Sequence, residues 1–118
     1  MPPEGSVERE FLETAIKWSQ LLHAGEPRKA NNKYDELYRL KGKMRQLPDR
    51  GEAALKRIST TQDPDVQIVA AAALLALDEP FATELLERIR DSIPGLPSFT
   101  AQMTLQEWEN GSIRDYWS

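Results

Sequence analysis

Few side chains in this sequence are of the kinds that carry out catalysis. His23 is the only histidine and there is no cysteine, so nothing supports a Ser-His-Asp or a Cys-His arrangement. The six glycines are isolated and do not form a phosphate-binding loop. We expect His23 to lie near the end of a helix, where the helix dipole stabilises a cation. The sequence therefore predicts a protein that is not an enzyme and has no catalytic residues.

Acidic side chains are the remaining candidates for chemistry, as ligands of a metal ion. Glu84, Glu87 and Asp91 follow one another at spacings of three and four, which places them on one face of a helix. Carboxylate metal sites on helices usually add a histidine at helical spacing, as in Glu-x-x-His, and none occurs here. We interpret these carboxylates as a solvated helix face and expect neither a metal nor a cofactor.

Charge is distributed unevenly along the chain, whose net charge is −4. Residues 28–57 contain ten Lys and Arg and four Asp and Glu, a net charge of +6, whereas the remainder carries −10. Such a segment is typical of solvated helix faces, or of a positive patch that meets an acidic partner. We predict that a groove between the helices expected at 28–47, 49–58 and 64–77 binds another protein. Its contact residues are expected to be Lys29, Asn32, Tyr34, Arg39 and Lys43, with Trp117 of the C-terminal tail as a further anchor.

Two other functions are compatible with this charge pattern. The basic face of residues 28–57 would suit nucleic acid, but the acidic remainder and the lack of a recognised nucleic-acid motif argue against it. An immunity-like role, in which the chain neutralises a bacterial toxin, suits a small acidic helical protein. We keep both as alternatives to a general protein-interaction domain.

Apolar residues recur at helical spacing in six segments, and no segment alternates as a strand would. The expected helices span residues 6–24, 28–47, 49–58, 64–77, 79–93 and about 96–110. Trp18 falls on the apolar stripe of the first helix and is expected in the core. The apolar residues of the sixth helix are Phe99, Met103, Leu105 and Trp108, of which Trp108 is expected to pack this helix onto the body.

Capping residues set the expected ends of these helices. The N-cap candidates are Ser6, Asp49 with Glu52 in a capping-box pattern, Asp63 before Pro64, and Asp78 before Pro80. Gly25, followed by Pro27, is expected to end the first helix. Gly42 weakens the second helix and is interpreted as a kink or as a close approach of another helix. Short connections favour antiparallel neighbouring helices.

The segment Asp63-Pro64-Asp65-Val66-Gln67, with alanines at 70–73, resembles a HEAT-type repeat. Such repeats carry an Asp-Pro-x-Val-Arg turn and then an Ala-rich inner helix, whose small residues let neighbouring helices approach closely. Gln67 stands where an arginine is usual, so a stacked Asp–Arg ladder is not expected. One repeat is visible, over about residues 51–93, and the first two helices are expected to cap it.

The whole chain also resembles a family of small bacterial proteins classified as a domain of unknown function. The resemblance lies in Arg28 to Asp35, in the Asp63 to Val66 turn with its Ala-rich helix, and in Ala101 to Trp108. It implies an all-α fold, a HEAT-like α-α superhelix of about six helices in a right-handed stack of antiparallel pairs. It implies no established activity and no catalytic residues.

One domain is expected over residues 1–118, with residues 1–6 and 112–118 less ordered. The longest apolar run, Ile68 to Leu77, has ten residues and is too short to span a bilayer. The first residues lack the basic and apolar regions of a secretory signal, and the absence of cysteine fits the cytoplasm. We therefore expect a cytoplasmic protein that does not associate with membranes.

Overall fold

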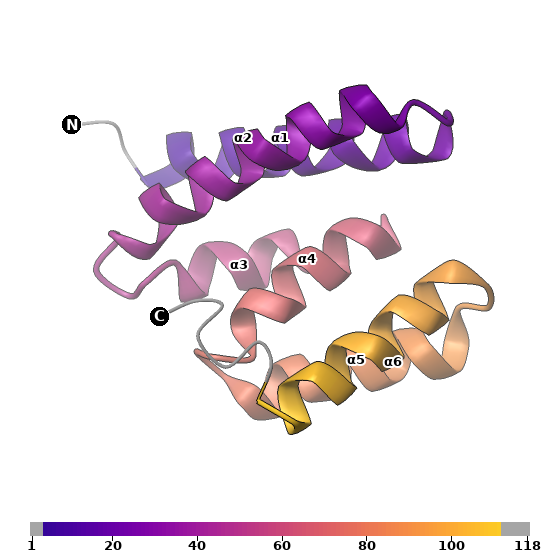
Figure 1. The fold of residues 1–118 in the computed structure, drawn as a ribbon. Coiled ribbons are helices and arrows are strands. Elements are labelled where there is room, and N and C mark those ends of the chain that lie inside the picture. The colour runs from indigo at the N-terminus through magenta and orange to yellow at the C-terminus, as the bar shows by residue number, and fades with distance from the viewer. Residues whose placement is uncertain (1–3, 112–118) are drawn as a thin grey trace. The chain divides into compact units, whose positions relative to one another are not determined.

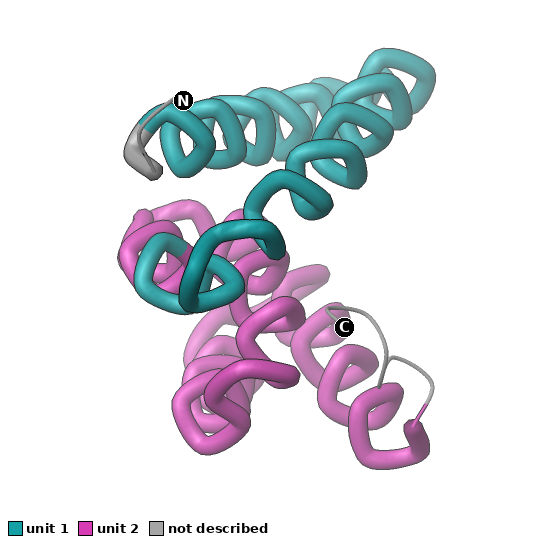
Figure 2. Tube along the Cα trace, turned by 90° about the vertical axis from the view of Figure 1, so that its left-hand side faces the viewer, with its two compact units in different colours: residues 1–54 teal, residues 55–118 magenta. Residues whose placement is uncertain are grey.

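The computed structural model describes residues 4–111 of the chain. This part contains six α-helices and no strand, which confirms the all-α prediction. The chain divides into two compact units, residues 1–54 and residues 55–118, coloured separately in Figure 2. Helix α3 (Glu52–Ile58) begins in unit 1 and ends in unit 2. Within the described range, no helix is both long and apolar enough to cross a membrane.

Unit 1 is built on a helical hairpin. Helix α1 (Glu4–His23) and helix α2 (Pro27–Arg45) are joined by a short connection and pack side by side in antiparallel directions (Figure 1). The buried apolar residues of the two helices are Phe11, Ala15, Ala30, Leu37, Leu40 and Met44. Burial of one such large side chain stabilises the fold by about 1.5–3 kcal/mol, so packing rather than helix propensity holds the hairpin.

The turn between α1 and α2 satisfies the last carbonyl groups of α1. Gly25 adopts a left-handed φ of 72°. The Glu26 N–H donates to the Leu21 carbonyl at 3.0 Å and the Gly25 N–H donates to the Leu22 carbonyl at 3.2 Å, the pair of bonds of a Schellman motif. The predicted end at Gly25 is confirmed. The predicted start is wrong, because α1 begins at Glu4 and Ser6 lies inside it.

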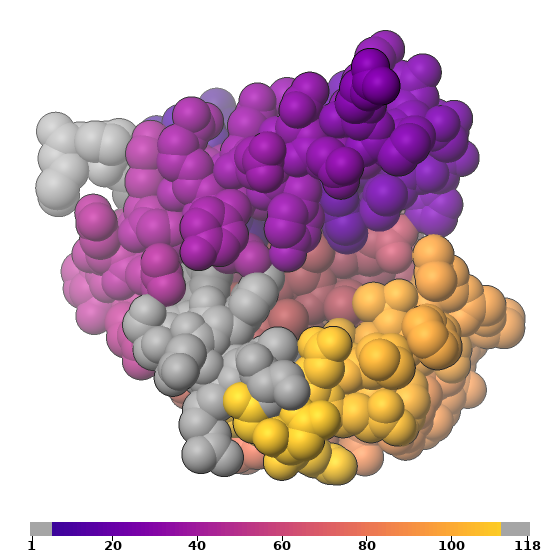
Figure 3. All heavy atoms as spheres, in the orientation of Figure 1, coloured from indigo at the N-terminus to yellow at the C-terminus, as the bar shows by residue number. Residues whose placement is uncertain are grey.

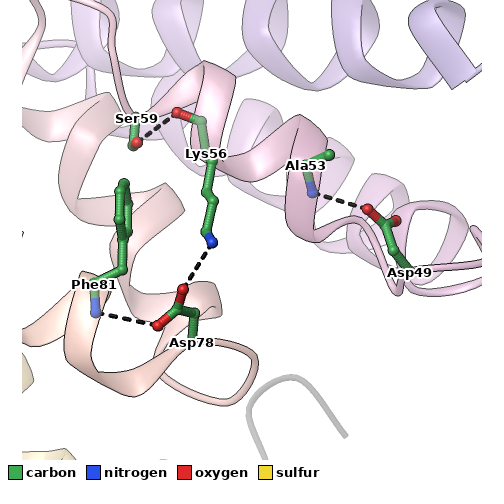
Figure 4. Close-up of polar contacts among 6 residues, drawn as sticks. All are labelled: Asp49, Ala53, Lys56, Ser59, Asp78 and Phe81. Carbon is green, nitrogen blue, oxygen red and sulfur yellow. Dashed lines mark hydrogen bonds and ion pairs between the residues drawn. The ribbon is translucent and has the colours of Figure 1, made fainter.

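The turn between α2 and α3 is stabilised by one carboxylate. Asp49 Oδ1 accepts from the Gly51 N–H at 2.9 Å. Asp49 Oδ2 accepts from the Ala53 N–H at 2.9 Å, as Figure 4 shows. Arg50 and Gly51 both have left-handed φ angles, 59° and 84°, which brings the first turn of α3 back over Asp49. Asp49 therefore caps α3, but from further upstream than a capping box predicts, because the helix begins at Glu52.

Gly42 lies within α2 and is not a contact point for another helix. A Cβ atom at this position would meet no atom within 4 Å. The interpretation of Gly42 as a close helix approach is therefore wrong. Gly51, in contrast, is closely packed, because a Cβ there would overlap the side chain of Met44.

Unit 2 is a bundle of three helices. Helix α4 (Pro64–Leu74) packs against α5 (Glu79–Ser92) and α6 (Leu96–Glu109), and α5 also packs against α6 (Figure 1). The buried residues of α4 include Val66, Ile68, Val69, Ala70, Ala71, Ala73 and Leu74. This helix is apolar on nearly every side, as expected for the central helix of a bundle.

The start of α4 agrees with the sequence and its end does not. Asp63 is the N-cap, and its Oδ1 accepts from the Asp65 N–H at 2.9 Å. The α-helix ends at Leu74 rather than at Leu77. The following residues continue in tighter turns, in which the Leu77 N–H donates to the carbonyl of Leu74 at 3.0 Å.

Candidate functional site

Four of the predicted contact residues line one face of α2. Lys29, Asn32, Arg39 and Lys43 are all exposed. With 3.6 residues per turn they fall within an arc of about 80° around the helix axis. Lys29 makes an ion pair of 3.0 Å with Glu26, which leaves the lysine side chain 69% exposed. We call Lys29, Asn32, Arg39 and Lys43 the α2 face; side chains of α2 are visible on the surface in Figure 3.

Tyr34 lies on the other side of the buried stripe of α2 and does not join this face. Its ring centroid is 6.0 Å from that of Trp18 on α1, with the two rings tilted by 52°. Trp18 was predicted to lie in the core. It lies against the hairpin but is only half-buried. Tyr34 therefore contributes to packing within the α1–α2 hairpin while 40% of it stays exposed.

Lys41 is the most unusual charged residue in unit 1. It is 4% exposed, and its Nζ lies 5.4 Å from the ring centroid of Tyr34 and 5.8 Å from that of Tyr38. Burial, together with the smaller effect of the nearby charge of Arg45, lowers the pKa of Lys41 to about 8. A lowered lysine pKa also occurs in catalytic lysines, but enclosure of this amine by two tyrosine rings favours a structural role. The sequence spacing could have predicted that Lys41 is buried, because Lys41 shares a helix face with Leu37 and Met44.

In unit 2, one lysine of the basic segment 28–57 is neutralised by an ion pair. Lys56 Nζ lies 2.7 Å from Asp78 Oδ2 and 5.2 Å from the ring centroid of Phe81 (Figure 4). Asp78 also accepts the Phe81 N–H at 3.3 Å as the N-cap of α5. The hydrogen bond from Lys56 is the main reason that the pKa of Asp78 lies below its ordinary value. Lys56 thus joins α3 to the start of α5 rather than adding an exposed charge.

A hollow of about 400 Å³ lies on unit 2 beside Phe81. It is lined by Ser59, Thr60, Gln67, Phe81, Glu84, Leu85 and Arg88. Its polar groups already have partners within the protein: the Ser59 hydroxyl donates to the Lys56 carbonyl at 2.7 Å, and the Gln67 amide donates to the Thr61 carbonyl at 2.5 Å. The hollow therefore has no converging free polar groups of the kind that orient a small ligand.

The residues considered for catalysis and metal binding are not brought together. Glu84 pairs with Arg88 at 3.6 Å, and Asp91 pairs with Arg90 at 2.8 Å. His23 is exposed in the last turn of α1. Across the described residues, no group of three or more His, Asp and Glu side chains is placed to hold a metal ion.

Helix α6 exposes two of the apolar residues that were named along it from the sequence. Phe99 is 63% exposed and Met103 is 39% exposed, whereas Ala101 and Leu105 are buried. The apolar residues of α6 therefore lie on two sides of the helix. Trp108 packs as expected and is half-buried, while Trp117 lies outside the described residues.

No family model, no curated protein and no solved structure matches this chain. The resemblance to a small bacterial family therefore stays a prediction, and function is inferred from the surfaces of the two units alone.

Proposed function

We propose that the chain is a non-catalytic domain that binds another protein through the α2 face. The observation that carries this proposal is that Lys29, Arg39 and Lys43 are exposed on one side of α2, while its aliphatic residues and Met44 are buried on another. An aligned row of cations without neighbouring catalytic groups suits an acidic protein surface, because complementary charge accelerates and orients association.

The absence of a catalytic role is part of this proposal. It is supported by the ion pairs of Glu84 and Asp91 and by the internal hydrogen bonds of the hollow near Phe81. A general acid or base must be free to exchange a proton with a substrate, whereas each of these two carboxylates is paired with an arginine. We propose that the protein acts in the bacterial cytoplasm. The sequence has no cysteine, and cytoplasmic proteins rarely contain disulfides.

The proposed binding surface is tested by affinity capture with two matched variants. R39E/K43E reverses two charges of the α2 face, and R9E/K17E reverses two exposed charges on α1, so that both variants have the same net charge. The partner captured by the wild type should be lost from R39E/K43E and retained by R9E/K17E. Equal capture by both variants would contradict a binding role for the α2 face.

We also propose that the helices form a HEAT-like α-α superhelix, a right-handed stack of antiparallel pairs, with residues 51–93 as the repeat. Support comes from the Asp63-Pro64 start of α4 and from its small buried residues Ala70, Ala71 and Ala73. Gln67, which replaces the usual arginine, donates to the Thr61 carbonyl and so anchors the turn before α4. An experimental structure with left-handed or orthogonal pairing of the helix hairpins would contradict this arrangement.

Nucleic-acid binding is the second candidate, favoured by the excess of Lys and Arg in residues 28–57. If it is correct, labelled DNA or RNA should bind the wild type at 50 mM salt, and affinity should fall steeply as salt rises. R39E/K43E should then weaken binding to every sequence to a similar extent. We expect no such binding, because Lys56 is paired and most of the chain outside residues 28–57 is acidic.

A toxin is the specific acidic partner in the immunity-like version of the proposal. This version is supported only by the small size and helical fold of the chain. Co-expression with the product of each neighbouring gene tests it: one product should arrest growth alone and not in the presence of this chain. Failure of R39E/K43E to protect would link that protection to the α2 face.

A further inference from the structure

Helix α6 has apolar residues on opposite sides. Its inner side buries Ala101 and Leu105, while Leu96, Phe99 and Met103 face outward with exposed fractions of 64%, 63% and 39%. Spacings of three and four put these three outward residues in one row along the helix. We call Leu96, Phe99 and Met103 the α6 stripe; α6 is coloured orange to yellow in Figure 3.

The α6 stripe lies in a part of the chain that has no charge. The fifteen residues between Asp91 and Glu107 include no Lys, Arg, Asp or Glu. The largest apolar patch on a protein surface is often an interaction site, and the centres of protein interfaces are depleted of charged residues. Both properties indicate a docking surface rather than scattered exposed residues.

The size of the α6 stripe argues against a second copy of the chain as the occupant. Large side chains have areas of about 150–250 Å², so three that are partly exposed present on the order of 300 Å². A stable dimer buries about 800 Å² on each partner. The α6 stripe is therefore sufficient for a short segment that contributes a few apolar side chains.

The charges carried by helices α5 and α6 indicate the chemistry of that segment. Helices α5 and α6 together contain six acidic and two basic residues, a net charge of −4. Both bases are already paired, Arg88 with Glu84 and Arg90 with Asp91. Glu107 follows Met103 by one turn on the same side of α6. Basic residues beside the apolar positions of a partner would be attracted, whereas nucleic acid and anionic membranes would be repelled.

We propose that the α6 stripe is the docking site for a basic amphipathic segment of a partner protein. The segment inserts apolar side chains spaced by three or four residues against Leu96, Phe99 and Met103. Its Lys and Arg residues lie toward Glu107 and the other acidic residues of α5 and α6. This surface is distinct from the α2 face, which has the opposite charge, so either proposal stands if the other fails.

A random library of displayed 14-residue peptides tests this assignment with the full chain as bait. Selection against wild type, with removal of peptides that also bind L96S/F99S, should enrich sequences that carry apolar residues at helical spacing and a net positive charge. Enrichment of neutral or acidic sequences, or no enrichment over the variant, would overturn it. Because Leu96 and Phe99 are on the surface, L96S/F99S should keep the thermal stability of the wild type.

The best enriched peptide then locates the site by titration into isotopically labelled full-length chain. Amide signals of residues 96–107 should shift, and affinity should fall about tenfold in Phe99→Ser and in Met103→Ser, but stay unchanged in R39E/K43E. Shifts confined to α2 would overturn the assignment. So would sedimentation showing that the chain dimerises and that Phe99→Ser makes it monomeric, because a second copy would then occupy the α6 stripe.

Discussion

The indole N–H of Trp108 donates a hydrogen bond to a carboxylate oxygen of Glu79, with 2.6 Å between Nε1 and Oε2. The two residues are 29 positions apart, so this bond joins the last turn of α6 to the first turn of α5. It closes the α5–α6 hairpin at the end opposite to its connecting turn. The Ser98 hydroxyl, which donates to the Arg90 carbonyl at 2.6 Å, secures the turn end.

Removal of the Trp108 donor should therefore destabilise unit 2. Trp108→Phe keeps an aromatic ring but no N–H, and should lower the free energy of unfolding by about 1 kcal/mol. Glu79→Gln retains an acceptor and should cost less. Urea denaturation of both variants and of the double variant measures the coupling, which should be positive. Strictly additive effects would mean that the bond does not contribute to stability.

Gly42 and Gly51 of unit 1 should respond in opposite directions to substitution by alanine. Gly42→Ala adds a methyl group in open space within α2 and should stabilise the chain by about 1 kcal/mol. Gly51→Ala places a side chain at a φ of 84° against Met44 and should destabilise by about 2 kcal/mol. The denaturation midpoints of the two variants and of the wild type, measured side by side, compare their stabilities. A destabilising Gly42→Ala would imply that α2 needs a kink at this position.

Lys41 should make stability depend on alkaline pH. Its pKa is about 8 in the folded chain and 10.5 for an ordinary lysine, so between these values the unfolded chain binds more protons. The contribution of this group to stability therefore rises from about pH 8 to pH 10.5, and the buried charge destabilises fully below pH 8. Lys41→Met should stabilise by about 1 kcal/mol at pH 7, with a smaller gain at pH 10.

Lys43→Met provides the control for this measurement, because Lys43 is exposed on the same helix. Its effect should be small and should not change between pH 7 and pH 10. A Lys41→Met variant that loses stability equally at both pH values would show that the contacts of Lys41 outweigh the cost of burying its charge.

Asp78 combines two interactions that substitutions can separate. Asp78→Asn keeps an oxygen for the Phe81 N–H and loses the ion pair with Lys56, whereas Asp78→Ala loses both, so alanine should destabilise more. The folded pKa of Asp78 lies below its ordinary 3.8, so its contribution is fully present above that pH and is lost as pH falls further. Thermal unfolding at pH 6 and pH 3 should therefore show a smaller difference between wild type and Asp78→Asn at pH 3.

Thr61 contains a buried hydroxyl with no hydrogen-bond partner among the described residues. Thr61→Val replaces that hydroxyl by a methyl group of similar shape and should stabilise by about 1 kcal/mol, because no bond is lost. Thr60→Val is the matched control: the Thr60 hydroxyl donates to the Arg57 carbonyl at 2.6 Å, so its loss should be mildly destabilising. Chemical denaturation of the pair distinguishes the two cases.

Local signals were sufficient to predict most of the fold. Asp63 and Asp78 act through their own side chains on the first turn of the helix that follows, so the starts of α4 and α5 are readable in a few residues. The Gly25 turn is local in the same way. The end of α4 could not be predicted from the sequence. Leu75 is as buried as the α-helical residues before it, although the backbone there already forms tighter turns.

The candidate surfaces were harder to predict because they depend on which side of a helix is covered. The exposed α2 face follows from the spacing of Lys29, Asn32, Arg39 and Lys43. In α6, the residues Phe99 and Leu105 are equally apolar, and only the packing of α4 and α5 decides that Leu105 is buried. Burial of Lys41 among apolar positions likewise depends on tertiary contacts that override the preference of a charge for water.

The short connections of the fold have a consequence for how fast it forms. Helices α1 and α2, and likewise α5 and α6, are consecutive in sequence, joined by a few residues, and packed against each other. Closing so short a loop costs little chain entropy, and low contact order is associated with folding in microseconds to milliseconds. Each hairpin should thus assemble early and locally, before contacts between residues distant in sequence are made.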